Sequence, residues 1–278
     1  MTTLAPSQIE AYERQGFLFP IPVLAADEVA RCVAGLDEIE ASLGGKAETG
    51  QLHGLFSHFR WAYDLVTHPK ILDAVESVLG PNLLVWQSSV FAKQPHDSGF
   101  ISWHQDGTYW GLDSHLVTTA WIALTESSTE NGCMRVVAGS QEQPVLPHVD
   151  TYAENNLLSR GQEIAVDVQE KEATDIVLRA GEMSLHHVNI VHGSRSNSSN
   201  RERIGFAVRY ISPAVKPTGR HQPVILARGE DRHGNFQKLS GPPEPGAIEE
   251  LVAAQLESTR QWLNEITSSQ GAYQKTKR

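Results

Sequence analysis

Three residues in two short stretches of the chain have the types and spacing of a metal-binding site. His104 and Asp106 form a His-x-Asp pair, and an isolated histidine, His192, follows 86 residues after Asp106. Residues two apart in a β-strand point to the same face, so His104 and Asp106 can reach one metal ion from one strand end. Two imidazoles and one carboxylate that leave part of the coordination sphere open are typical of non-haem Fe(II) oxygenases. A cupin-like hydrolase or isomerase could use the same ligands with zinc or manganese, and three such residues also occur together by chance.

The sequence around these residues resembles the phytanoyl-CoA dioxygenase family of Fe(II)/2-oxoglutarate oxygenases. The resemblance extends over about residues 16–213. It rests on four motifs: W-H-Q-D-G at 103–107, T-A-W-I-A-L at 119–124, N-G-C-M-R-V at 131–136 and H-G-S-x-x-N-x-S at 192–199. In this family an arginine eleven residues after the second histidine binds the distal carboxylate of 2-oxoglutarate, and Arg203 stands at that spacing here.

The resemblance implies roles for seven residues. His104, Asp106 and His192 would bind Fe(II), and Arg203 would bind 2-oxoglutarate. Three further residues match family positions near the co-substrate: Ser194, Trp121 and Gln87. Turn chemistry in a Gly- and Ser-rich stretch can also explain Ser194, and packing in the core can also explain Trp121.

The sequence around Arg203 agrees with the implied role. Arg203 begins an apolar, alternating run to Tyr210 that predicts a core strand. A buried guanidinium needs a partner, and its planar fork matches a carboxylate with two parallel hydrogen bonds. The alternative partner is one of the 33 acidic residues, in a structural salt bridge.

Candidates for the substrate pocket lie close to the metal ligands in sequence. Tyr109 and Trp110 follow Asp106 and would wall the pocket, unless they only pack in the core. Arg135, on a predicted strand, could bind a substrate anion, although an ordinary surface ion pair also explains it. Residues 141–171 are polar and weakly patterned, and long segments of this kind are usually functional or mobile, so we interpret them as a lid or insertion over the pocket.

The predicted elements indicate a mainly β fold with flanking helices. Helical periodicity and capping signals predict helices over 7–15, 25–43, 69–79 and 246–268. Short apolar runs predict many strands, the first a proline-containing edge strand at 17–24. The resemblance implies a double-stranded β-helix, which is a jelly roll of the cupin-like kind. We expect a single dioxygenase domain over 1–278: a helical part at about 1–80, a jelly-roll core at about 82–213, and a C-terminal extension with a helix at 214–278.

Composition excludes several classes of protein. A formal net charge of −10 argues against a nucleic-acid partner, and we expect no membrane partner either because no apolar run approaches a membrane span. The first residues lack the pattern of a signal peptide, and the two cysteines form no disulfide framework. These features predict a cytoplasmic protein with a small-molecule substrate. They do not indicate an oligomeric state.

The resemblance therefore predicts a 2-oxoglutarate-dependent hydroxylase that uses Fe(II), 2-oxoglutarate and O2 and releases succinate and CO2. Relatives that halogenate carry a small residue in place of the metal-binding carboxylate, so the presence of Asp106 favours hydroxylation. The acidic chain has no obvious basic cluster for CoA phosphates, which favours a small polar metabolite of the amino-acid, compatible-solute or phosphonate type. An acyl-CoA or a natural product remains the alternative substrate.

Overall fold

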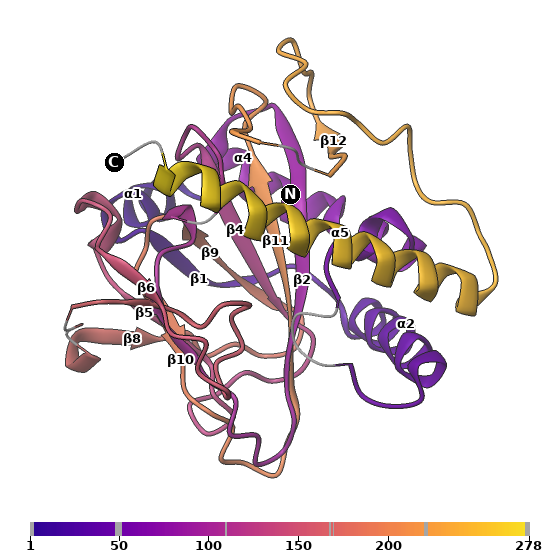
Figure 1. The fold of residues 1–278 in the computed structure, drawn as a ribbon, viewed down its shortest axis with the longest axis horizontal. Coiled ribbons are helices and arrows are strands. Elements are labelled where there is room, and N and C mark those ends of the chain that lie inside the picture. Colours follow the sequence, from indigo (N-terminus) through magenta and orange to yellow (C-terminus); the bar gives the residue numbers. More distant parts are fainter. Residues whose placement is uncertain are drawn as a thin grey trace.

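Two antiparallel sheets face each other in the structure, a computed structural model that describes residues 3–47, 52–108, 110–166, 168, 170–219 and 222–275 (Figure 1). The larger sheet has six strands, in the order β1 (Phe17–Pro22), β9 (Glu182–His187), β4 (Val117–Ala123), β11 (Arg203–Ile211), β2 (Leu83–Lys93) and β12 (Ile225–Arg228). The smaller has four, in the order β3 (Ile101–His104), β10 (His192–Ser194), β5 (Met134–Val137) and β8 (Ala173–Asp175). Strands far apart in the sequence are neighbours in both sheets, so the two halves of the chain jointly build the space between them.

Helices cover the outer face of the larger sheet. They are α1 (Pro6–Gln15), α2 (Ala26–Leu43), α3 (Arg60–Val66) and α4 (Pro69–Leu79), with the short 3-10 helix η1 (Leu55–Ser57) before α3. A final helix, α5 (Ile248–Lys275), lies across the front of the molecule in Figure 1. Three further 3-10 turns interrupt the loops: η2 (Asp106–Thr108), η3 (Ser140–Glu142) and η4 (Glu170–Glu172).

Alternation along the strands separates two cores. On β11, Ile204, Phe206, Val208 and Tyr210 point toward the helices and join the main hydrophobic core. Ala207 points the other way and packs between the two sheets with residues such as Trp121 and Met134. The face that carries Arg203 is therefore the inner face. This arrangement is the double-stranded β-helix that the sequence predicted.

The structure corrects some details of the predicted elements. Helix α1 begins at Pro6, one residue before the predicted start at residue 7, and its N-cap is Ala5. β1 lies at an edge of the larger sheet, as its prolines predicted. The sheet continues past the expected boundary at residue 213, because β12 pairs with β2.

The segment 141–171 contains a separate two-stranded sheet. β6 (His148–Asp150) pairs with β7 (Gln162–Ile164), and the connecting residues return to the wall of the central cavity at Leu157 and Leu158. Within the described part of the chain, no helix combines the length and the apolar character needed to cross a bilayer.

Candidate active site

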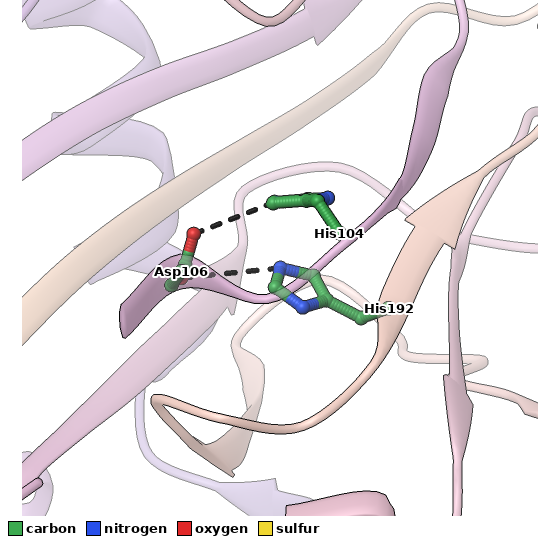
Figure 2. A group of neighbouring side chains, drawn as sticks. All are labelled: His104, Asp106 and His192. Carbon is green, nitrogen blue, oxygen red and sulfur yellow. Dashed lines mark ion pairs between the residues drawn. The ribbon is translucent and has the colours of Figure 1, made fainter. Parts of the chain in front are cut away.

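His104, Asp106 and His192 converge at one end of the space between the sheets, as Figure 2 shows. Their candidate ligand atoms all lie within 4.8 Å of one another, and no other group of three such residues occurs in the described residues. Asp106 Oδ1 lies 3.4 Å from His104 Nε2, and Asp106 Oδ2 lies 3.9 Å from His192 Nε2. His104 ends β3, whereas Asp106 begins the 3-10 turn η2, so the two ligands do not share one strand as expected.

Pairing between β3 and β10 brings the histidines together. His192 is the direct antiparallel partner of His104. Gly193 follows in the same strand, and a Cβ atom there would lie only 2.8 Å from the carbonyl oxygen of Ile101 on β3. A residue without a side chain at 193 thus permits the close approach of the strands that sets the distance between the imidazoles.

Hydrogen bonds to the backbone fix which nitrogen of each imidazole is free. His104 Nδ1–H donates to the carbonyl oxygen of Ser102 at 2.9 Å, and His192 Nδ1–H donates to that of Ile190 at 3.0 Å. In the neutral imidazole, donation from Nδ1 leaves the lone pair on Nε2. Both Nε2 atoms face the carboxylate of Asp106, and backbone carbonyls are usual partners of metal-binding histidines. The donor set fits a divalent metal ion.

Electrostatics favour the protonation states that a metal requires. Burial, with a smaller effect of His104, lowers the pKa of His192 to about 4. Burial alone would raise the pKa of Asp106. Contact with the two imidazoles in their protonated forms and the charge of Arg209 outweigh that effect and hold this pKa well below the usual value. At neutral pH the site therefore offers a neutral imidazole at 192 and an ionised carboxylate.

A cavity of about 340 Å³ extends from these residues and contains the guanidinium of Arg203. Arg203 is 2% exposed, and its Nε and Nη2 atoms have no hydrogen-bond partner. No ion pair with Arg203 forms among the residues that the structure describes, so the predicted alternative of a structural salt bridge is not seen. Burial lowers the pKa of Arg203 to about 10, which leaves it charged at neutral pH. An unpaired buried guanidinium in a cavity fits an anionic ligand.

Ser194 and a buried lysine lie beside Arg203. Lys93, the cross-strand partner of Arg203, is fully buried and donates from Nζ to Ser194 Oγ at 2.7 Å and to the carbonyl oxygen of Arg195. Burial, together with the charge of Arg203, lowers the pKa of Lys93 to about 6. Because Ser194 Oγ accepts from Lys93, its own proton can be donated into the cavity. Sequence analysis selected Ser194 but missed Lys93, whose place opposite Arg203 follows from strand pairing.

Trp121 forms the floor under the Arg203 guanidinium. The Arg203 Cζ atom lies 5.4 Å from the centre of the indole, a cation–π distance. Gly205 makes room for this ring: a Cβ atom there would lie 1.9 Å from Trp121 Cζ2. The indole orients the arginine and excludes water from one of its faces.

Comparison with known proteins agrees with this geometry. The family model of phytanoyl-CoA dioxygenase (PhyH) matches residues 12–205. The chain belongs to the phytanoyl-CoA dioxygenase family. It is therefore a dioxygenase by family, and the match includes the three clustered residues and Arg203.

Individual relatives of this PhyH family member align with most of its chain. A probable alpha-ketoglutarate-dependent hypophosphite dioxygenase of Stutzerimonas stutzeri is 29% identical over 230 residues, 76% of this chain and 79% of that one. L-proline trans-4-hydroxylase of Streptomyces griseoviridis is 24% identical over 199 residues, 66% and 74% of the two chains. The apo structure of the non-heme monooxygenase ThoJ, 33% identical, superposes with a TM-score of 0.81 over 95% of this chain and 99% of ThoJ.

Two other predicted residues lie away from the cavity of this PhyH member. Gln87 is buried but does not line the cavity, and its Oε1 accepts a hydrogen bond from the Ser88 amide at 2.8 Å. Arg135 forms ion pairs with Glu170 at 3.2 Å and Asp175 at 3.1 Å. On β5 the neighbouring Met134 lines the cavity, and alternation turns residue 135 to the opposite face. The ion-pair interpretation of Arg135 therefore holds.

The predicted aromatic wall is present in part. Trp110 lines the cavity and packs on Trp86 with ring centres 5.2 Å apart. Tyr109 lies outside the described residues. A third histidine, His186 of β9, also borders the cavity. Its buried ring lines the cavity 5.0 Å from the His192 ring and is not part of the three-residue cluster.

Arg209 is the main residue of the PhyH site that sequence analysis missed. It lines the cavity from β11, four positions beyond Gly205 and six beyond Arg203, on the same face of the strand. The signal was present in the sequence, because residues separated by an even number in a strand share a face.

Proposed function

We propose that this protein is an Fe(II)- and 2-oxoglutarate-dependent dioxygenase that hydroxylates an unactivated C–H bond of a small polar metabolite and releases succinate and CO2. The observation that carries the proposal is one cavity that holds both the His104, Asp106 and His192 cluster and the unpaired guanidinium of Arg203. A metal hydrolase would need the cluster but has no use for that guanidinium.

Three of these residues would bind the metal ion, and the fourth would bind the co-substrate. Nε2 of His104, Nε2 of His192 and a carboxylate oxygen of Asp106 would hold Fe(II) on one side and leave the cavity side open. When bound, Fe(II) with 2-oxoglutarate supplies the oxidation of the C–H bond by O2, with decarboxylation of the co-substrate. Arg203 would bind the distal carboxylate of 2-oxoglutarate in the fork of its guanidinium.

The neighbours of Arg203 would position the co-substrate. Ser194, whose Oγ accepts from Lys93, would donate its own proton to the same carboxylate. Trp121 would cover one face of the guanidinium and keep water away. The apolar surroundings strengthen each of these charge-assisted contacts because they lower the local dielectric.

The cavity volume supports a small substrate. About 340 Å³ lies near the lower end for ligand pockets, and here the co-substrate and the substrate share it. Two relatives are named for small polar substrates, hypophosphite and L-proline. Others are named for phytanoyl-CoA, which represents the acyl-CoA alternative. An acyl-CoA would have to place its long acyl chain in the same space.

Succinate release tests the proposed function and the substrate class together. Purified protein with Fe(II) and 2-oxoglutarate under air is screened with amino acids, compatible solutes, phosphonates and short acyl-CoA thioesters. The proposal predicts that a small polar compound stimulates succinate release and gains one oxygen atom from O2. A thioester that stimulates far more strongly than every small compound would overturn the substrate class. Halogenation of the product in the presence of chloride would overturn hydroxylation.

A further inference from the structure

Arg209 places a second buried guanidinium in the cavity, away from Arg203. Both arginines and Ala207 project from the inner face of β11 and line the cavity. At about 3.3 Å per residue, the six steps along the strand from Arg203 to Arg209 separate their Cα atoms by roughly 20 Å. The two guanidinium groups therefore serve different ends of the cavity. Strand pairing places Arg209 on the metal side. It pairs with Thr119 of β4, which pairs with His186 of β9, and the His186 ring lies 5.0 Å from the His192 ring.

The surroundings of Arg209 leave its charge without an acidic partner. Its Nη1 donates to Ser89 Oγ at 2.6 Å, and its Cζ lies 5.8 Å from the ring centre of Phe91 and 5.5 Å from that of Trp110. Arg209 forms no ion pair within the described ranges, and burial lowers its pKa, an effect that Asp106 opposes. Aromatic rings stabilise a cation but do not neutralise it. A buried charge of this kind calls for an anion.

Ser89 and His53 hold Arg209 in one orientation. Ser89 Oγ accepts from Arg209 and lies 2.7 Å from His53 Nδ1. A hydroxyl has one proton and two lone pairs, so Ser89 can accept from Arg209 and keep its hydrogen bond with His53 at the same time. Ser89 and His53 are positioning residues that act through Arg209.

The C-terminal helix closes this end of the cavity. Gln255 Nε2 donates to the carbonyl oxygen of His53 at 2.9 Å, and Thr259 Oγ1 donates to the same oxygen at 3.3 Å. One turn further along α5, Trp262 packs on the His53 ring with centres 4.3 Å apart and lines the cavity with Leu263. The space beside Arg209 is thus bounded by aromatic and aliphatic groups, contributed partly by a helix beyond the family match.

We propose that Arg209 binds an anionic group of the substrate, so that the enzyme acts on small organic oxyanions, carboxylates or phosphonates, whose apolar part lies against Trp110 and Trp262. This inference rests on the proposed function. With a divalent metal and a 2-oxoglutarate dianion bound, the charges of Asp106, Arg203 and Arg209 sum to one positive charge, and a proton taken up by the buried Lys93 would add to it. An anionic substrate offsets this positive charge, whereas a neutral or cationic substrate leaves it buried.

Nuclear magnetic relaxation of simple probes tests the inference without knowledge of the natural substrate. The full-length protein is loaded with Mn(II), which is paramagnetic, and with saturating 2-oxoglutarate, whose binding is measured by calorimetry under the same conditions. The probes are acetate, methylphosphonate and neutral acetamide. The variants are Arg209→Gln, Arg209→Lys and Ser89→Ala, with Arg179→Gln as the control because Arg179 is an exposed arginine on the surface. Circular dichroism melts confirm folding of each variant.

Wild type is expected to enhance relaxation of acetate or methylphosphonate over acetamide, and which anion responds more strongly identifies the preferred group. Arg209→Gln should weaken anion binding about tenfold or more, the order expected for a lost charge-assisted hydrogen bond, while Arg209→Lys retains part of it. The anion affinity of Ser89→Ala should lie between those of wild type and Arg209→Gln, and the anion affinity of Arg179→Gln should match that of wild type. Equal relaxation of acetamide, or anion binding unchanged in folded Arg209→Gln, would overturn the inference. Absence of 2-oxoglutarate binding would instead overturn the proposed function.

Discussion

Arg203 and Arg209 lie six residues apart on one face of β11, both buried and both without an acidic partner among the described residues. Such an arrangement is unstable unless ligands neutralise it, because burial of an unpaired charge is costly. We therefore propose that the inner face of β11 provides two anion-binding ends of the cavity that also holds the cluster of His104, Asp106 and His192.

Replacement of Arg203 tests the co-substrate end. Arg203→Met keeps a long apolar side chain but removes the guanidinium, and we expect the KM for 2-oxoglutarate to rise about 10- to 100-fold, the loss of one or two charge-assisted hydrogen bonds. Saturating 2-oxoglutarate should restore part of the rate. Steady-state succinate kinetics measure both quantities, and Arg179→Gln is the matched surface control. An unchanged KM would show that the distal carboxylate binds elsewhere.

Removal of one metal ligand tests the cluster directly. Asp106→Ala should weaken binding of Fe(II) or Mn(II) about 100-fold or more, because changes even to groups that support metal ligands cost 10- to 100-fold. With the pKa of His192 lowered to about 4 by burial and by His104, this ligand is neutral at pH 7, and its contribution to metal affinity should decline only as pH falls toward about 4. Anaerobic calorimetry across pH measures both effects. Metal affinity unchanged in Asp106→Ala would contradict the assignment.

The lowered pKa of Lys93 predicts that the protein takes up a proton when 2-oxoglutarate binds. Without the co-substrate, burial and the charge of Arg203 lower the Lys93 pKa to about 6, so the amine is neutral at pH 7. A dianion beside it raises that pKa, so binding takes up a proton and 2-oxoglutarate affinity should fall as pH rises above about 6.

Calorimetry at pH 7 in two buffers of different ionisation enthalpy measures this uptake. Lys93→Met should abolish the difference between buffers, and Lys216→Met, at an exposed lysine, should not change it. Identical heats for the wild type in both buffers would be inconsistent with a neutral Lys93 next to the co-substrate.

Gly205 is expected to be intolerant of any side chain. Gly205→Ala places a Cβ 1.9 Å from Trp121 Cζ2, so the indole or the strand must shift. We expect a loss of about 1–3 kcal/mol in the free energy of unfolding, the usual range for overpacking, together with weaker 2-oxoglutarate binding because Trp121 supports Arg203. Chemical denaturation measures the first. Gly45→Ala is the control, since a Cβ there meets nothing within 4 Å. Equal stabilities of the two variants would argue against the packing account.

Local sequence signals predicted most elements and selected the three residues that cluster in the structure, because periodicity, caps and the His-x-Asp spacing are local properties. Helix α4 over Pro69–Leu79 matches its predicted range, since Pro69 and Gly80 mark both ends. Residues whose role depends on what faces them across the fold were harder to predict. The sequence alone could not distinguish an ion-paired Arg135 from a pocket residue, because its partner Asp175 lies on another strand, β8. Lys93 lies beside Arg203 only because β2 pairs with β11. His53 and Trp262 meet only because α5 returns to the cavity, which no local pattern encodes.

Oxygen-dependent release of succinate from 2-oxoglutarate tests the central claim most directly. The wild type, His192→Ala, Arg203→Met and the surface control Arg179→Gln are compared with and without Fe(II), and anaerobic binding of 2-oxoglutarate to each Fe(II) form is measured alongside. We predict succinate that requires iron, is lost in His192→Ala, is reduced in Arg203→Met at low 2-oxoglutarate, and is unchanged in Arg179→Gln. Metal-loaded wild type that neither binds 2-oxoglutarate nor forms succinate would contradict the assignment of this site as a 2-oxoglutarate oxygenase centre.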